Sequence, residues 1–378
     1  MSYKMKVYLD NAATTPIDGE VLKVITDTLS NDFGNPSSSH SEGRKARAKL
    51  EQARKKIAKL LNVSSSEIIF TSGGTEANNL AIQSVLNSAD IQQVITTDIE
   101  HHAVLNTIEK CCKERGGELV KLKLNSKGEI DLAELTMLLQ LNKKTFVSLM
   151  HGNNEVGNLL PLEKVANICS ENGAIFHCDS VQTIGHEVLD LNKVNVNFVT
   201  CSAHKIHGPK GVGFLYVNKA MQLEPLFYGG NQEKGFRPGT ENVALILGMA
   251  KALEIAYGSL DLYEENIRQR RKQLIAGIKQ SVPGVVLNGS QKECMSTVVS
   301  VRFDTDMDAG MLLFQMDLKG VCVSGGSACS SGSLKGSHVL TAIGDDKELP
   351  TLRFSFSRNT TSVEIEYAVS CLKEILQK

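Results

Sequence analysis

The residues with the clearest chemistry are an acid and a lysine that follow neighbouring apolar runs. Asp179 follows the run 174–178, and Lys205 follows the run 197–201 in a Ser-Ala-His-Lys context, 26 positions further on. A lysine in a loop at the edge of a sheet is more often a solvated surface charge. Paired with an acid, however, it is what a pyridoxal phosphate enzyme needs. The acid keeps the pyridine nitrogen protonated, and the lysine holds the aldehyde as a Schiff base.

A glycine-rich turn supports that interpretation. Residues 67–70 (EIIF) are a candidate strand, and Thr71-Ser72-Gly73-Gly74-Thr75-Glu76 leads from them into a helical run over 77–86. This geometry exposes backbone N–H groups at a helix N-terminus, where hydrogen bonds and the helix dipole favour a phosphate. The alternative is structural, with glycine making a tight turn and Ser72 or Thr75 capping the helix.

Three further side chains have a reactive or a structural interpretation, and the residues alone leave both open. Cys329 lies in a loop of small residues, 324–333, where its thiol is either a mobile nucleophile or an inert loop cysteine. His101 either stacks on a pyridine ring and exchanges protons near neutral pH or is structural. Arg353 either clamps a substrate carboxylate through its two-pronged guanidinium or forms a structural salt bridge.

Alternating apolar runs and helical segments predict an α/β fold with a mostly parallel sheet flanked by helices. Ligands of such sheets bind beyond the carboxyl ends of the strands. Polar clusters follow several of the runs, which predicts that they meet at one edge of the sheet. The runs are 94–97, 119–122, 146–150, 174–178, 197–201 and 212–217, and the clusters begin at Glu100, His151, Asp179 and Ser202.

The composition excludes several classes of protein. Lys+Arg 41 against Asp+Glu 42 leaves almost no net charge, which argues against nucleic acid or an anionic membrane as a direct partner. No apolar window reaches membrane-spanning length, and the N-terminus lacks the apolar core of a secretion signal, so we expect a cytoplasmic protein. The 9 cysteines show no paired Cys-x-x-Cys clusters, so we predict neither a disulfide framework nor a metal site.

Two segments bear on the organisation of the chain. Residues 43–59 are basic, but Leu50, Ala53 and Ile57 recur at helical spacing, which predicts an amphipathic helix with a solvated charged face. A long helical stretch is expected from Val243 to about Gln280. A change near Gly258 divides the chain into a large cofactor-binding domain, 16–258, and a smaller α+β domain. The smaller domain comprises 1–15 and 259–378 and carries a mobile loop at about 324–336.

Together these motifs resemble a known family. YLDNAATTP, FGNPSS, FTSGGTEANN, EHHAVL, HGNNEVG, HCDSVQ, SAHKIHGPKG, RPGTENV, GGSACSS, SHVL and LRFSFSR are similar to those of the NifS/IscS-like cysteine desulfurases, which have the class V aminotransferase fold (fold type I). The resemblance runs from about Val7 to the C-terminus. It implies a homodimer that uses pyridoxal 5'-phosphate to convert L-cysteine to L-alanine and leaves the sulfur as a persulfide on a loop cysteine.

The resemblance also implies a role for individual residues. Lys205 would carry the cofactor, Asp179 would pair with its pyridine nitrogen, and Gln182 would bond its phenolic oxygen. His101 would stack on the ring and assist proton transfer, and Cys329 would attack the substrate sulfur. The phosphate would be held by Gly74, Thr75, Ser202, His204 and, from the other subunit, Thr240, and the substrate carboxylate by Asn154, Arg353 and Asn35.

The sequence departs from the family pattern at Gly336, where many relatives have a proline, and this difference bears on the stiffness of the loop. The loop resembles the long form of the branch that passes sulfur to a scaffold protein, so iron–sulfur cluster assembly or tRNA thiolation is the expected destination of the sulfur. The alternatives are a selenocysteine lyase, another class V aminotransferase, or a sulfur-relay protein without turnover.

Overall fold

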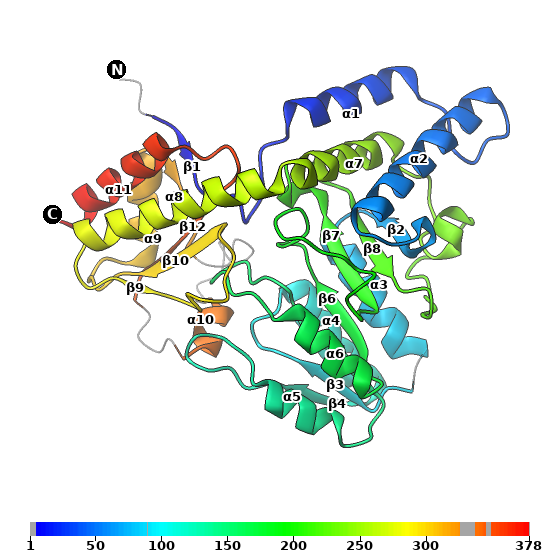
Figure 1. Cartoon of the computed structure of the whole chain (residues 1–378), viewed down its shortest axis with the longest axis horizontal. Coiled ribbons are helices and arrows are strands. Elements are labelled where there is room, and N and C mark those ends of the chain that lie inside the picture. Colours follow the sequence, from blue (N-terminus) through cyan, green and yellow to red (C-terminus); the bar gives the residue numbers. More distant parts are fainter. Residues whose placement is uncertain (1–4, 89, 326–336, 345–348, 378) are drawn as a thin grey trace.

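A seven-stranded sheet lies at the centre of the larger part of the molecule (Figure 1). The computed structural model describes residues 5–88, 90–325, 337–344 and 349–377. The strands lie in the order β2-β8-β7-β6-β5-β3-β4. Strand β8 runs in the direction opposite to the other six, so it is antiparallel to both β2 and β7. Their bounds are β2 Ile68–Thr71, β3 Gln93–Thr96, β4 Glu118–Lys121, β5 Thr145–Ser148, β6 Ile175–Asp179, β7 Phe198–Ser202 and β8 Gly213–Val217. The predicted mostly parallel sheet is therefore confirmed.

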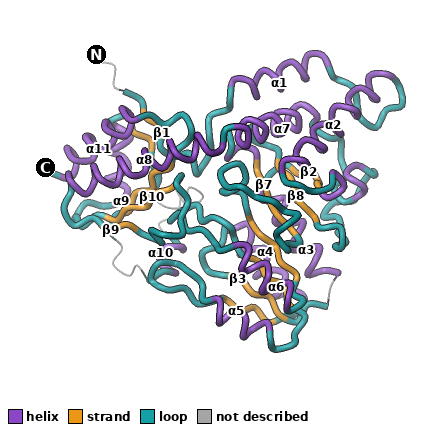
Figure 2. Tube along the Cα trace, viewed as in Figure 1, coloured by secondary structure: helices purple, strands orange, loops and turns teal. Residues whose placement is uncertain are grey.

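Helices cover both faces of this sheet (Figure 2). Helices α3 (Gly74–Ser88) and α4 (His102–Arg115) pack on one face, where Leu80 and Ile108 meet Phe146 and Phe198 of the strands. The other face is covered by α2 (Ser41–Leu60), α5 (Leu132–Leu139), α6 (Leu162–Glu171) and α7 (Val243–Gly258), while α1 (Gly19–Asn31) packs on α7. Because both faces are buried, the inner strands are almost continuously buried rather than alternating, whereas the edge strand β4 is partly exposed.

The basic segment forms the amphipathic helix that its spacing predicts. Leu50, Ala53 and Ile57 face the core from α2, and most of its lysines face solvent. Arg54 is an exception, because its buried guanidinium donates to both carboxylate oxygens of Glu233 at 2.6 and 2.7 Å. The segment therefore contributes to the core, as expected of an amphipathic helix.

The N-terminus and the C-terminal third form a second, smaller core (Figure 1). Strand β1 (Val7–Tyr8) pairs in parallel with β11 (Val321–Cys322), and β9 (Val286–Leu287), β10 (Val298–Arg302) and β12 (Thr351–Ser355) form an antiparallel sheet in the order β12-β10-β9. Its helices are α8 (Leu260–Ser281), α9 (Ala309–Leu318) and α11 (Ser362–Leu376). Helix α10 (His338–Ala342) instead packs Val339 against Ile99 and Val156 of the larger part of the molecule. Val7 and Leu9 are fully buried in this core, so the N-terminal strand packs with residues more than 250 positions away.

The helical stretch expected from Val243 to about Gln280 is present, but it consists of two helices, α7 and α8. The structure breaks it at Ser259, whose φ of −140° and ψ of 28° are not helical, and the axes of α7 and α8 differ by 74°. Gly258 ends α7, and glycine has the lowest helix propensity after proline. Among the described residues no single helix is long and apolar enough to span a membrane, and only the bent pair α7 and α8 passes that test together.

Candidate active site

A cavity of about 270 Å³ lies beyond the carboxyl ends of the parallel strands. Strands β3, β5, β6 and β7 run in the same direction, so the segments that follow them meet at one edge of the sheet. Side chains from all four segments line the cavity, together with the start of α3 and residues of the smaller core. The lining is Ala12, Ala13, Gly74, Thr75, Asn78, His101, His102, Met150, Gly152, Asn154, Glu155, Asp179, Val181, Gln182, Ser202, His204, Lys205, His338 and Arg353.

Most of the residues singled out in the sequence come together here. The cavity is lined by the following members of that set: Gly74, Thr75, His101, Asn154, Asp179, Gln182, Ser202, His204, Lys205 and Arg353. Asn35 and Thr240 do not line it. Asn35 is exposed in the loop between α1 and α2, and Thr240 is exposed in the loop before α7. Cys329 lies outside the described residues.

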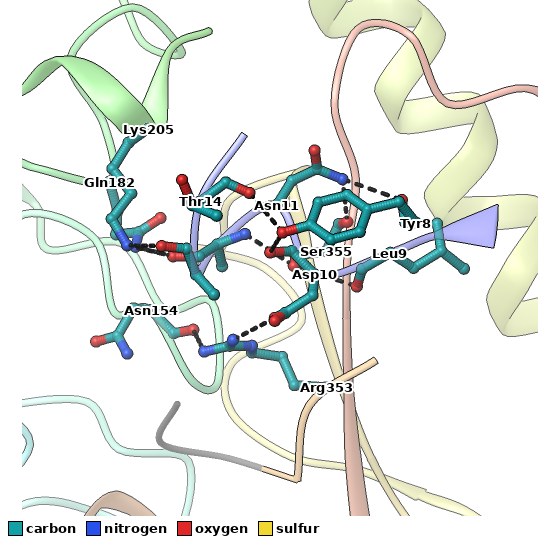
Figure 3. A network of polar contacts seen from close by, with 12 residues as sticks. Tyr8, Leu9, Asp10, Asn11, Thr14, Asn154, Gln182, Lys205, Arg353 and Ser355 are labelled. Atoms are coloured by element: carbon teal, nitrogen blue, oxygen red, sulfur yellow. Dashed lines mark hydrogen bonds and ion pairs between the residues drawn. The ribbon is translucent and has the colours of Figure 1, made fainter. Parts of the chain in front are cut away.

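Lys205 ends a short 3-10 helix, Ala203–Lys205, that directly follows β7. Its ammonium group donates to the carbonyl oxygens of Ala12 and Ala13 at 2.5 and 2.9 Å (Figure 3). The Gln182 amide also donates to the Ala12 carbonyl, at 3.0 Å. The N-terminal loop therefore holds the amine in the cavity beside Gln182.

Asp179 is the last residue of β6 and is 6% exposed. One carboxylate oxygen accepts the backbone N–H of Val181 at 3.0 Å, and the other accepts the Asn78 amide at 2.7 Å. The sequence analysis did not single out Asn78. The available signal was its position on α3, four residues after Gly74, because residues at i and i+4 share one face of a helix.

Two residues before Asp179, strand β6 contains the buried, neutral His177. The His177 ring is fully buried in β6, with Nδ1 2.8 Å from the Ser148 hydroxyl and Nε2 3.2 Å from the Thr200 hydroxyl. Burial lowers its pKa to about 4. The same cause, with the same value, applies to His151, His204 and His207.

We therefore expect the protein to lose stability as the pH falls from about 6.5 to 4. In this window the histidines of the unfolded chain, whose pKa is about 6.5, bind protons, whereas the same buried histidines of the folded chain stay neutral. The contribution of neutral His177 is fully present above the unfolded pKa and is lost as the pH falls through the folded one, up to about 3 kcal/mol. Thermal denaturation against pH should show a shallower decline for His177→Asn. An unchanged slope would contradict this, and exposed His40, replaced by Asn, is the control.

The glycine turn brings the N-terminus of α3 to the cavity. Gly73 has a φ of 153°, which side-chain-bearing residues rarely adopt, and a Cβ added at Gly74 would lie only 2.8 Å from Cγ2 of Val181. Both positions therefore require glycine. The first-turn N–H groups of a helix have no partner within the helix, and here Gly74 and Thr75 present that turn to the cavity.

His101 is the N-cap of α4, and its Nδ1 accepts the backbone N–H of Ala103 at 3.0 Å. The proton of the neutral ring is therefore on Nε2. Burial lowers the pKa of His101, the Lys205 charge lowers it further, and the Asp179 carboxylate opposes both. The ring is consequently neutral near pH 7, with a proton available at Nε2.

The smaller core contributes Arg353, in the middle of β12. Its side chain is 1% exposed and donates from Nη2 to Asp10 at 2.7 Å and from Nη1 to the Asn154 carbonyl at 2.9 Å (Figure 3). The buried Nε has no hydrogen-bond partner in the part of the chain that the structure describes. Arg353 thus ties the N-terminal loop to the segment after β5.

Ser337, which caps α10, and His338, its first residue, also meet the larger core. The His338 Nε2 lies 3.0 Å from the Glu100 carbonyl, and its ring centroid lies 4.4 Å from that of His102. The Ser337 hydroxyl donates to the Glu155 carboxylate. Sequence reasoning missed this contact because its members are about 180 or more positions apart and no local pattern links them.

Comparisons with known proteins identify the class of protein that this fold and cavity define. The family model "Aminotransferase class-V" matches residues 7–368. The cysteine desulfurase IscS of Dictyoglomus turgidum is 41% identical over 381 residues, which cover 99% of this chain and 95% of the relative. The chain belongs to the class-V aminotransferase family and is a pyridoxal phosphate-dependent enzyme.

Solved structures narrow this class. A NifS-like protein has a TM-score of 0.92 at 35% identity, with 99% of this chain and 100% of that protein covered. SspA, solved in complex with cysteine, has a TM-score of 0.82 at 33% identity, with 94% of this chain and 100% of that protein covered. Within its family the chain groups with the NifS/IscS-like cysteine desulfurases. The resemblance, fold class and cofactor predicted from the sequence are therefore confirmed.

The residues of the cavity fit pyridoxal phosphate. The first turn of α3 offers N–H groups to a phosphate, and Asp179 offers a carboxylate to a protonated ring nitrogen. The amine of Lys205 faces the same space. The Oδ1 of Asn78 is buried without a hydrogen-bond partner among the described residues, as expected where a polar group completes the site.

Proposed function

We propose that the protein removes sulfur from L-cysteine, releases L-alanine, and transfers the sulfur to the thiol of Cys329 as a persulfide. The observation that carries this proposal is one cavity that combines the amine of Lys205, the carboxylate of Asp179 and the guanidinium of Arg353. The relatives described as cysteine desulfurases support it. Substrate cysteine and an enzyme thiol together contain the atoms of alanine and a persulfide, so no external oxidant or reductant is required.

Each residue near the cofactor has a distinct task in this proposal. Pyridoxal phosphate, when bound, supplies an electron sink that weakens the bonds around the substrate Cα and Cβ. Lys205 holds the cofactor, and Asp179 keeps a proton on the pyridine nitrogen. Gln182 bonds the phenolic oxygen. The phosphate is held by Gly74, Thr75, Ser202 and His204.

Four further residues act on the substrate or on its protons. Arg353 and Asn154 bind the α-carboxylate, which fixes the amino acid with its sulfur in the cavity. His101 would stack on the ring and move protons, a role that suits its lowered pKa and the proton on its Nε2. Cys329 then attacks the substrate sulfur.

The proposal includes a homodimer in the cytoplasm. Thr240 and Asn35 are exposed and do not line the cavity of their own chain. A second copy is proposed to supply Thr240 to the phosphate, with Asn35 near the substrate carboxylate. Sedimentation of the holoprotein, and complementation between a Thr240→Ala chain and a Lys205→Ala chain in a mixed dimer, test this arrangement.

Replacing Cys329 with serine is expected to lower sulfide release from L-cysteine by about tenfold or more, because the hydroxyl is a far weaker nucleophile toward sulfur than a thiolate. The assay measures alanine and sulfide in parallel, and a persulfide-reactive label should mark wild-type protein only. The visible spectrum of the cofactor should not change. Cys294→Ser, a half-buried cysteine outside the cavity lining, is the control.

Full desulfurase activity in Cys329→Ser would overturn the persulfide step. Alanine formation that requires a keto-acid acceptor would instead indicate an aminotransferase, and a strong preference for selenocysteine would indicate a selenocysteine lyase. The acceptor is proposed to serve iron–sulfur cluster assembly or tRNA thiolation. Radiolabelled sulfur from cysteine, followed into co-purifying proteins under mild reduction, identifies it.

A further inference from the structure

The loop after β1 touches several functional side chains of the cavity at once. The carbonyls of Ala12 and Ala13 accept from Lys205, and Ala12 also accepts from Gln182. The Thr14 hydroxyl lies 3.2 Å from Nδ1 of His204. Asp10 is the only charged residue between positions 9 and 16 of this loop, and its carboxylate pairs with Arg353 (Figure 3).

The backbone of this loop is held firmly against β12. The Asn11 amide donates to the Ser355 carbonyl at 2.8 Å, and the Ala12 N–H donates to the Ser355 hydroxyl at 2.9 Å. The Tyr8 hydroxyl donates to the carbonyls of Asp10 and Thr14 at 3.1 and 2.8 Å. The Asp10 carboxylate is therefore presented to Arg353 by fixed backbone, two residues beyond the neighbouring strand β1.

The Asp10–Arg353 pair is mostly buried. The side chains are 22% and 1% exposed, and the Asp10 oxygen lies 2.7 Å from Nη2 of Arg353. Charges in such surroundings interact more strongly than in water, because solvent screens them less. A guanidinium that already has an anionic partner attracts a second carboxylate less than an unpaired guanidinium would.

We propose that Asp10 is an internal counter-ion that sets the affinity of the cavity for α-carboxylates. This inference rests on the proposed role of Arg353 as the carboxylate-binding group. L-Cysteine and L-alanine carry the same α-carboxylate, so attraction by Arg353 strengthens substrate and product binding alike. Such uniform binding does not raise kcat, and tighter product binding slows release. Asp10 offsets part of the Arg353 charge and thereby favours departure of alanine.

A different role for Asp10 predicts the opposite sign. If its main task were to hold the guanidinium in the correct plane, its loss would weaken carboxylate binding. Asparagine separates the two roles, because it retains an oxygen that can accept from Nη2 and removes the negative charge. The second hold on Arg353, the Asn154 carbonyl at 2.9 Å, is independent of residue 10.

The test measures binding of radiolabelled L-alanine to holoenzyme by equilibrium dialysis. Asp10→Asn should bind L-alanine about tenfold or more tightly than wild type, because one unit of opposing charge beside the guanidinium is removed. The KM for L-cysteine should fall in the same proportion. Ethylamine, which is alanine without its carboxylate, should bind both proteins equally.

Asp18→Asn is the matched control. Asp18 forms an ion pair with Arg358 of the same kind, but neither residue lines the cavity, so alanine binding should stay at the wild-type level. If Asp10→Asn fails to fold, judged by circular dichroism, Asp10→Ser removes the same charge and should shift alanine binding in the same direction. Unchanged or weaker alanine binding by a folded Asp10 variant overturns the proposal.

The dialysis measurement separates this proposal from the proposed function. If Asp10→Asn binds alanine more tightly than wild type, but wild type forms no alanine from cysteine, the counter-ion role of Asp10 is supported and the desulfurase function is contradicted. If wild type is an active desulfurase, but Asp10→Asn binds alanine as wild type does, the desulfurase function is supported and the counter-ion role is contradicted. Raising the salt concentration should reduce the difference in alanine affinity between wild type and Asp10→Asn only slightly, because the Asp10–Arg353 pair is mostly buried.

Discussion

Replacing Lys205 with alanine is expected to abolish the visible absorption of the lysine-bound cofactor and to lower desulfurase activity by at least about 10³-fold. Covalent attachment and proton transfer by a positioned amine are lost together, and general acid–base catalysis by itself contributes about 10²–10⁴-fold. The fold should survive. Lys205 is half-buried, and the carbonyls that it contacts, those of Ala12 and Ala13, lie beside the open cavity, where water can replace the amine.

Lys210→Ala is the matched control for this prediction. Lys210 is exposed, lies five positions further along the same loop, and does not line the cavity. Its loss should leave both the absorption band and the activity near the wild-type level. Added methylamine tests the chemistry further, because a small free amine should restore part of the activity of Lys205→Ala. Persistence of the visible band in Lys205→Ala would show that another group carries the cofactor.

The sequence predicted those parts of the site that follow directly from strand order. In a parallel sheet the residues at and just beyond the end of each strand are placed by the strand itself, so Asp179 at the end of β6 and Lys205 after β7 had to lie near one another. The glycine turn after β2 follows the same rule, because β2 is antiparallel to β8, which is antiparallel to β7. Local patterns suffice where local structure decides the position.

Contacts between segments far apart in the sequence could not be predicted in this way. The pairing of Asp10 with Arg353 depends on β1 joining β11, and on the loop after β1 lying along β12. Glu100 shows the same limit on a smaller scale. The sequence grouped it with His101 as a polar residue at the site, but the structure buries its carboxylate against the Met150 N–H at 2.7 Å. Burial raises its pKa well above the usual range.

The broken helix at Ser259 illustrates why propensity was insufficient. Residues 243–280 contain strong helix formers on both sides of Gly258, and a single weak position costs only about 1 kcal/mol in an otherwise helical segment. Packing decided the outcome, since α7 lies on the large sheet beside α1 and α2, while α8 packs on α11 of the smaller core. The 74° bend satisfies both partners.

The environment of Asp179 makes its charge easy to test without disturbing the fold. Its two oxygens accept from a backbone N–H and from the Asn78 amide, and both are neutral donors. Asparagine has nearly the same shape, keeps one acceptor oxygen for the Val181 N–H, and turns an NH₂ group toward Asn78. The Asn78 side chain can rotate its unpartnered Oδ1 toward that group, so the local packing has a route to adjust.

Asp179→Asn is therefore expected to lower kcat by about 10³-fold. A unit charge about 4 Å from the group it stabilises is worth about 4 kcal/mol at an effective dielectric constant of 20, and each 1.36 kcal/mol is tenfold in rate. The cofactor should remain bound through Lys205, while the pH dependence of its absorption should shift because the pyridine nitrogen loses its anionic partner. Asn78→Ala removes one hydrogen bond from a neutral donor to the same carboxylate and should cost only about tenfold, since a hydrogen bond to a charged group contributes about 1.5 kcal/mol. Single-turnover alanine formation measures both variants. Equal losses in the two would show that the orientation of Asp179, rather than its charge, limits the reaction.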